Sequence, residues 1–184
     1  MIRTTIVAFL LLISGYSISL AGTIYKMQAG VVNFYSTAPQ ELIHASSEDL
    51  RGAIDPDKKT FAFKISIVSF KGFNNALQQE HFNENYMEST VFSQATFIGK
   101  IIEDVDFSKN GEYDVRAKGK LLIHGIEHER LVKAHITTKD GKMNVHAEFI
   151  LELSDYNVKI PRIVDSKLAN NIRITVNAQF IPNK

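Results

Sequence analysis

The segment YDVRAKGKL, residues 113–121, alternates one residue at a time between apolar or small side chains and charged ones. Tyr113, Val115 and Leu121 fall on one face, and Ala117 and Gly119 share it. Successive side chains of a β-strand point to opposite sides, so this alternation predicts a strand with one buried face. The small residues favour a bend where two backbones approach closely.

Working outward, the same alternation recurs along the chain. The apolar faces comprise Phe61, Phe63, Ile65 and Ile67; Val145, Ala147, Phe149, Leu151 and Leu153; and Ile172, Ile174, Val176, Ala178 and Phe180, with further strand signals at Val32, Phe34, Phe97, Ile101, Ala134, Ile136 and Thr138. Asn110-Gly111 and Asp140-Gly141 tolerate the positive φ that tight hairpin turns demand. We therefore expect an all-β chain with about eight antiparallel strands.

Two segments lack the alternation of the strands. Residues 77–89 read as one or two helical turns, and residues 157–171, which include Pro161, read as a long loop or a short helix. No internal repeat, linker or low-complexity stretch divides the chain. Its 184 residues are enough for one domain with a sizeable core.

Closure of the sheet into a barrel is expected because an open sheet would leave two edge strands unpaired. A barrel of about eight strands has an interior that side chains fill or that holds one small ligand. The apolar face of each strand then points inward. The side chains predicted to line the lumen are Phe34, Phe61, Phe63, Ile65, Ile67, Phe97, Val115, Ala117, Leu121, Phe149, Leu151, Ile174 and Val176.

The small inward residues leave two interpretations of that interior open. Ala117, Gly119, Ala134, Ala147 and Ala178 leave volume unfilled, and a continuous volume would form a dry tunnel suited to an alkyl or isoprenoid chain. Alternatively, the side chains interdigitate, and the packed barrel serves as an interaction module.

The N-terminus carries the pattern of an export signal. Arg3 precedes an unbroken apolar run at residues 6–13, and Ser19-Leu20-Ala21 places small residues two apart, as a signal peptidase requires. Serines and a glycine interrupt the apolar stretch, which is shorter than a membrane-spanning helix needs. We expect a signal peptide at residues 1–21 and no stable membrane span after its removal; the alternative is a retained anchor.

Composition excludes several classes of function. Removal of Arg3 with the leader leaves 20 Lys+Arg against 20 Asp+Glu, a formal net charge of zero. The one-sided basic field of a nucleic-acid binder is therefore missing. The chain has no cysteine, which excludes disulfides, thiolate metal sites and a cysteine nucleophile.

The first histidine cluster is expected to be structural. His124 and His128 are four residues apart, but Gly125 lies between them at a predicted strand end. Helical geometry is therefore disfavoured, and we expect satisfied or solvated turn residues rather than metal ligands.

A second cluster suggests the alternative of a secreted hydrolase. His81 lies among Glu80, Glu84 and Glu88, carboxylates that share one side of a helical turn. Such a row is more often a solvated face. The chain has no nucleophile elbow, zinc-protease helix or phosphate-cradling loop. We therefore predict no catalytic residue, no metal ligand and no enzyme activity.

Five fragments follow one another in a characteristic order and spacing: Val32-Asn33-Phe34; Leu50-Arg51-Gly52-Ala53-Ile54-Asp55; His81-Phe82-Asn83-Glu84-Asn85-Tyr86; Gln94-Ala95-Thr96-Phe97; and Lys118-Gly119-Lys120-Leu121-Leu122-Ile123-His124-Gly125-Ile126. Together they resemble the YceI family of lipocalin-like, polyisoprenoid-binding proteins, and the last fragment is the most specific.

The resemblance implies a barrel domain at residues 22–184 whose apolar lumen holds an amphiphilic lipid: a polyisoprenoid, an isoprenoid quinone or a fatty acyl chain. It implies no other cofactor, no catalytic residues, and a periplasmic or secreted location in bacteria. Homodimer formation stays open. The chain has Leu153-Ser154-Asp155-Tyr156-Asn157 where many members show Arg-Ser-Asp-Phe-Gly, so a headgroup preference is not carried over.

Overall fold

The computed structural model describes residues 23–164 and 166–183. The predicted leader at residues 1–21 lies outside them. The strands are β1 (Tyr25–Thr37), β2 (Leu42–Ser47), β3 (Arg51–Asp55), β4 (Thr60–Ser66), β5 (Gln94–Ile101), β6 (Gly111–Ile123), β7 (Ile126–Lys139), β8 (Lys142–Glu152) and β9 (Asn171–Pro182). Among the described residues, no helix combines the length and the apolar composition needed to cross a bilayer.

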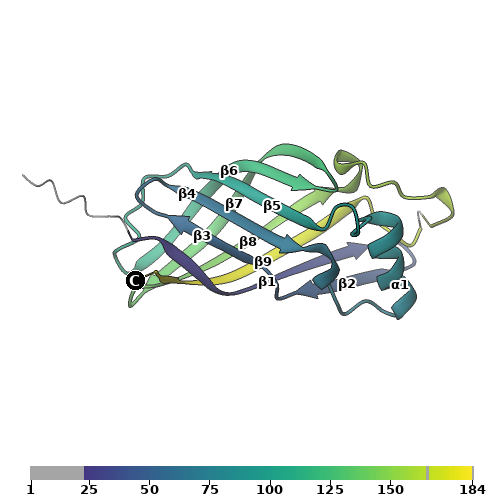
Figure 1. The fold of residues 1–184 in the computed structure, drawn as a ribbon, viewed down its shortest axis with the longest axis horizontal. Helices are drawn as coiled ribbons and strands as arrows, with labels where there is room; N and C mark the ends of the chain where they lie inside the picture. Colours follow the sequence, from purple (N-terminus) through teal and green to yellow (C-terminus); the bar gives the residue numbers. More distant parts are fainter. Residues whose placement is uncertain (1–22, 165, 184) are drawn as a thin grey trace, which may run out of the picture.

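Every strand pairing is antiparallel, and β1 closes the sheet by pairing with β9 (Figure 1). Eight strands, β1 and β3 to β9, form the ring, and β2 is an additional strand on β1. The expectation of an antiparallel barrel of about eight strands with one short helical insert is confirmed. Closure leaves the ring without a free edge strand.

The long strand β1 joins the two ends of the sheet. One of its edges pairs with β9 from Tyr25↔Pro182 to Ser36↔Ile172, with a bulge after Met27. Its other edge pairs with β3 near its start and with β2 near its end. The amide of Asn183 also donates to the carbonyl of Ile24 at 2.8 Å, so the first and last described segments lie side by side.

The turns explain how the hairpins close. Asp140-Gly141 joins β7 to β8 with positive φ at both residues, as predicted, and His124-Gly125 joins β6 to β7 in the same way. The prediction of a tight hairpin turn at Asn110-Gly111 is wrong. A longer loop, residues 102–110, joins β5 to β6, and Gly111 already belongs to β6.

Two facing glycines let β5 and β6 approach at one point. Gly99 pairs with Gly119. A Cβ on Gly99 would lie 2.2 Å from the carbonyl oxygen of Lys118, and one on Gly119 would lie 2.4 Å from that of Ile98. Only glycine fits this close backbone approach, which agrees with the bend expected from the small residues.

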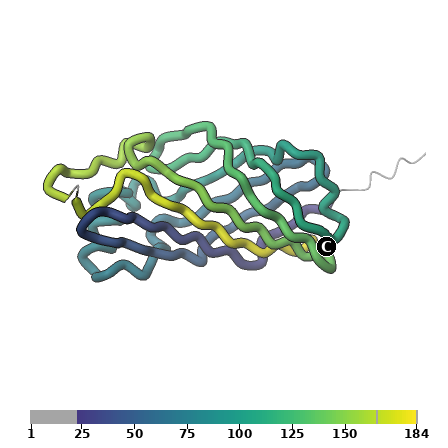
Figure 2. The backbone as a smooth tube through the Cα atoms, turned by 180° about the vertical axis from the view of Figure 1, so that it is seen from behind, coloured from purple at the N-terminus to yellow at the C-terminus, as the bar shows by residue number. Residues whose placement is uncertain are grey.

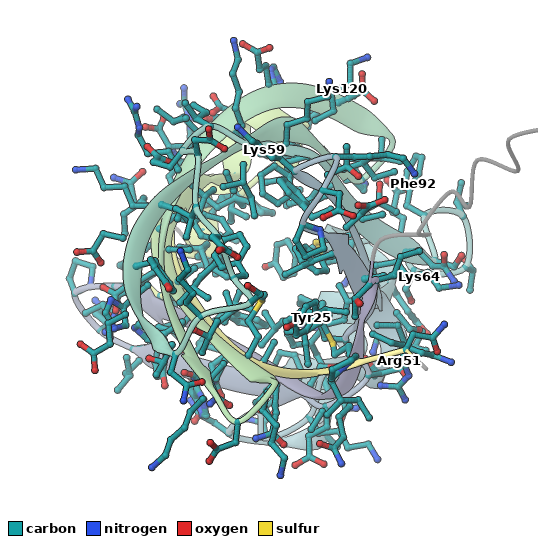
Figure 3. The ribbon with its side chains drawn as sticks, turned by 90° about the vertical axis from the view of Figure 1, so that its left-hand side faces the viewer. Tyr25, Arg51, Lys59, Lys64, Phe92 and Lys120 are labelled. Carbon is teal, nitrogen blue, oxygen red and sulfur yellow. The ribbon has the colours of Figure 1, made fainter. Side chains whose placement is uncertain are left out.

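The two ends of the barrel differ. At the end that holds both terminal segments the interior is packed, and Tyr25 lies inside the ring when the barrel is viewed along its axis (Figure 3). We call this the terminal end; its buried side chains are Tyr25, Ile54, Phe61, Ile101, Phe107, Val115, Ile136 and Met143. The tube view in Figure 2 shows the long strands running from there to the opposite end.

The opposite end, which we call the mouth, carries the helical segments (Figure 1). They are η1 (Ile67–Ser69), α1 (Ala76–His81), the π-helical η2 (Phe82–Tyr86), η3 (Leu153–Tyr156) and η4 (Arg162–Val164). The side chain of Asn75 caps α1 by accepting from the amide of Gln78 at 2.9 Å. The expected helical insert is therefore confirmed; it begins at Ala76, and Leu77 on it is exposed.

Candidate binding cavity

A cavity of about 240 Å³ lies inside the barrel on the mouth side. Apart from Lys64, Tyr86 and Thr96, its lining is apolar: Met27, Val32, Phe34, Leu50, Phe63, Ile65, Ile67, Phe70, Phe82, Met87, Ala95, Phe97, Leu121, Ile123, Val132, Val145, Phe149, Leu151, Leu153, Val158, Leu168, Ile172, Ile174, Val176, Ala178 and Phe180. A site with so few polar partners disfavours bound water and favours hydrocarbon.

Small residues on one wall create the empty space. Across β8, β9 and β1, the inward pairs Ala147↔Val176 and Val145↔Ala178 continue to Val32 and to Gly30, respectively. These short side chains cannot reach the centre of the barrel. The interior is therefore left unfilled beside this wall.

Phenylalanine rings from β4, β5 and β9 form the floor of the cavity. Phe63, Phe97 and Phe180 line it, and the rings of Phe63 and Phe180 are 5.9 Å apart. Phe61 lies against this layer, with its centroid 5.3 Å from Phe63 and 4.8 Å from Phe97, but does not line the cavity. The floor separates the cavity from the packed terminal end.

A second aromatic cluster covers the cavity at the mouth. Phe82 of η2 stacks on Phe34 of β1 at 5.4 Å, and Phe70 and Phe73 pack around both rings at 5.1–5.9 Å. Aromatic pairs at these distances add to the free energy of burial. They hold the segment from η1 to η2 over the opening.

The connection between β8 and β9 forms the rest of the roof. Leu153, Val158 and Leu168 line the cavity from this connection. Its return to the barrel is fixed by the amide of Ala169, which donates to the buried hydroxyl of Ser36 at 2.9 Å. The roof is therefore hydrogen-bonded to the strand that closes the sheet.

One buried imidazole ties the roof segments together. His124, 8% exposed, lies between the carboxylate of Glu88, at 2.8 Å from Nε2, and the carbonyl of Tyr156, at 3.0 Å from Nδ1. Both partners present an oxygen acceptor, one to each ring nitrogen. Phe92 packs edge-on against the ring at 4.5 Å. His124 is thus a satisfied turn residue that joins three segments.

The second histidine cluster is not brought together as an active site. Glu88 pairs with His124 rather than with His81, and Glu80 and Glu84 are exposed. Within residues 23–164 and 166–183, no three His, Asp or Glu side chains are grouped closely enough to hold a metal ion.

Where β7 and β8 approach the mouth, the barrel wall lacks the backbone ladder between these two strands. Their ladder ends at Ala134↔Ala147, although both strands extend further. Beyond it, Arg130 donates to the carbonyl of Ile150 at 2.6 Å and lies 3.6 Å from the carboxylate of Asp155. Side chains rather than backbone ladders therefore close this part of the wall, beside the cavity-lining Val132 and Phe149.

Tyr86 brings a hydroxyl group to the otherwise apolar lining. Burial raises the pKa of its phenol, so the group stays neutral and can donate a hydrogen bond. The two other polar lining residues, Lys64 and Thr96, pair with each other at outward positions of β4 and β5. Tyr86 is therefore the candidate contact for a polar group on a ligand.

Tyr156 yields a stability prediction because its buried hydroxyl has no hydrogen-bond partner among the described residues. We expect Tyr156→Phe to raise the free energy of unfolding by about 1 kcal/mol, since the desolvated hydroxyl is removed. Urea denaturation at neutral pH measures the change. A loss of 1 kcal/mol or more would contradict it.

The same substitution should change how the free energy of unfolding depends on pH under alkaline conditions. Burial raises the pKa of Tyr156 above its ordinary 10.0, so the folded state favours the neutral phenol. This raised pKa contributes to the free energy of unfolding. The contribution is fully present below pH 10.0 and is lost as pH rises through the folded-state pKa, because Tyr156 of the unfolded chain ionises first. Tyr156→Phe should flatten this decline, and an unchanged decline counts against the assignment.

Ten of the thirteen residues predicted to line the lumen border the cavity: Phe34, Phe63, Ile65, Ile67, Phe97, Leu121, Phe149, Leu151, Ile174 and Val176. Their contact with a ligand stays a prediction. The structure places Phe61, Val115 and Ala117 outside the lining, toward the terminal end.

Sequence reasoning missed the roof residues Phe70, Phe82, Tyr86, Val158 and Leu168. They lie in irregular segments without a period of two. The aromatic residues clustered between positions 70 and 86 were the one available signal.

The profile of the YceI-like domain family matches residues 24–180. A structure described as a polyisoprenoid binding domain from Saccharophagus degradans superposes with a TM-score of 0.74 at 14% identity, covering 86% of this chain and 98% of that one. The structure of BcnA from Burkholderia cenocepacia superposes with a TM-score of 0.68 at 15% sequence identity, covering 82% of this chain and 95% of that one. A YCEI protein of Campylobacter jejuni superposes with a TM-score of 0.57 at 19% sequence identity, covering 74% of this chain and 82% of that one. No curated protein matches the chain.

Proposed function

Since this chain belongs to the YceI-like domain family, we propose that its cavity binds the hydrocarbon tail of one amphiphilic lipid and that the protein carries or sequesters that lipid. Polyisoprenoids, isoprenoid quinones and fatty acyl chains are the candidate classes. The description of the Saccharophagus degradans domain as polyisoprenoid-binding supports the same assignment.

The observation that carries the proposal is the apolar cavity of about 240 Å³ with an aromatic floor and roof. A dry cavity of roughly 150 Å³ already binds benzene in another protein. Burial of a few hundred Å² of ligand surface would contribute several kcal/mol before the costs of association. Apolar burial alone therefore supports useful affinity without catalysis.

The polar end of the ligand is assigned to the mouth. The Tyr86 hydroxyl offers a donor there, whereas buried side chains separate the cavity from the terminal end. We further propose that the protein acts in the periplasm or outside the cell, after removal of residues 1–21.

Native mass spectrometry tests the proposal directly. Protein purified from its own host without detergent should carry one lipid, released on organic extraction and identified in the extract. Delipidated protein should then take up palmitic acid or farnesol at one molecule per chain. An exported protein of similar size, purified identically, controls for lipid carried over. Absence of extractable lipid together with failure to take up either probe would overturn the proposal.

A further inference from the structure

The five most exposed large apolar side chains all lie at the mouth. They are Ile163 (88% exposed), Val91 (70%), Leu42 (58%), Leu77 (56%) and Val68 (55%). In Figure 1 the connection between β8 and β9 and helix α1 lie at this same end, opposite the C-terminus. The exposed apolar surface is therefore concentrated where the cavity is roofed.

Ile163 stands out because of the charges around it. It lies in η4, within residues 158–168, a segment whose ends, Val158 and Leu168, face the cavity. Lys159, Arg162 and Lys167 of this segment are exposed. We call residues 158–164 and 166–168 the basic loop; in sequence, the stretch 158–168 holds these three cations and one acid, Asp165.

The basic loop therefore combines an apolar root in the cavity roof with an exposed isoleucine among cations. Polybasic segments with an exposed apolar side chain bind the interface of bilayers that contain anionic lipids. A folded protein partner would have to supply a matching pocket for Ile163, whereas a bilayer interface accepts this side chain without one.

From this arrangement we propose that the basic loop docks the mouth of the barrel onto an anionic bilayer, with Ile163 inserted between headgroups and Lys159, Arg162 and Lys167 beside the phosphates. This inference rests on the proposed function, for which it names the source or destination of the lipid. Docking there would let a tail pass between bilayer and cavity with little exposure to water.

The other charges at the mouth set the orientation. Glu80 and Glu84 of the helical insert are exposed, and the carboxylate of Glu88 is shared with His124. An anionic surface repels these carboxylates. Contact is therefore centred on the basic loop, and the helical insert is tilted away from the bilayer.

Sedimentation with vesicles tests the docking. The protein should bind phosphatidylcholine vesicles that contain phosphatidylglycerol and bind pure phosphatidylcholine weakly, and added salt should reduce the difference. Ile163→Ser should weaken binding roughly tenfold or more through lost apolar burial. Joint replacement of Lys159, Arg162 and Lys167 by glutamine should weaken it about a hundredfold at low salt.

Matched controls lie on the barrel wall. Ile98→Ser removes an aliphatic side chain that is 54% exposed on β5, and Lys133→Gln removes an exposed cation of β7. Both should bind vesicles as the wild type does. Failure of the wild type to bind anionic vesicles, or equal binding by the loop variants and the controls, would overturn the docking.

A solution measurement separates this inference from the proposed function. Uptake of palmitic acid from water should be unchanged in Ile163→Ser, because Ile163 does not line the cavity. Uptake without vesicle binding refutes the docking and leaves the binding function standing. Absence of extractable lipid together with failure of the wild type to take up palmitic acid or farnesol refutes the binding function, on which this inference rests.

Discussion

Val176→Trp is expected to weaken binding of a long-chain ligand about a hundredfold or more while the barrel stays folded. Val176 points into the cavity from the wall of small side chains, so an indole ring there occupies the space that a tail would take. Exclusion of about four methylene groups removes ~3 kcal/mol of apolar burial, which is roughly a hundredfold in affinity. Titration with the fluorescent fatty acid cis-parinaric acid measures the loss.

The neighbouring residue supplies the matched control. Asn177→Trp places the same ring on the exposed face of β9 and should leave affinity unchanged. Ala95→Phe fills the cavity from the opposite wall and should reproduce the loss if Val176→Trp does not fold. Wild-type affinity in either folded cavity variant would show that the ligand binds elsewhere.

Phe61→Ala and Phe63→Ala are expected to differ strongly in stability although the residues share one face of β4. Phe61 is 4% exposed and packs beneath the floor, so its truncation should cost about 3–5 kcal/mol. Phe63 already borders empty space on one side, so fewer contacts are lost and the cost should be about 1–2 kcal/mol.

Urea midpoints with a common m-value give both free energies. Phe63→Ala should also enlarge the cavity and admit bulkier ligands, whereas Phe61→Ala should act on stability. Equal losses in the two variants would mean that the cavity does not extend to Phe63.

The period-two pattern predicted which way each side chain points because strand geometry fixes it. Phe63, Leu121 and Ile174 point inward, as expected. The pattern carries no information about depth along the barrel. Phe61 and Val115 therefore looked equivalent to their neighbours, yet they lie in the packed terminal end. Which end is hollow depends on side-chain volumes across several strands at once.

The residues that form the roof could not be predicted from the sequence for a different reason. Phe70, Phe82 and Leu168 are placed by turns, a π-helical segment and hydrogen bonds to distant strands. Such contacts have no local period. Similarly, His124 was expected as a turn residue, but its burial depends on Glu88 and Tyr156, which lie far away in sequence.

Because Ile24 and Asn183 lie next to each other, the barrel can be circularly permuted. A short glycine-serine linker can join Asn183 to Ile24, and new ends can open at the exposed Asp140-Gly141 turn. Such a circular permutant keeps every strand pairing but reverses the order in which β8 and β1 are synthesised. Fluorescent proteins or surface tethers attached at these positions lie far from the roof, so immobilised barrels would keep their openings accessible.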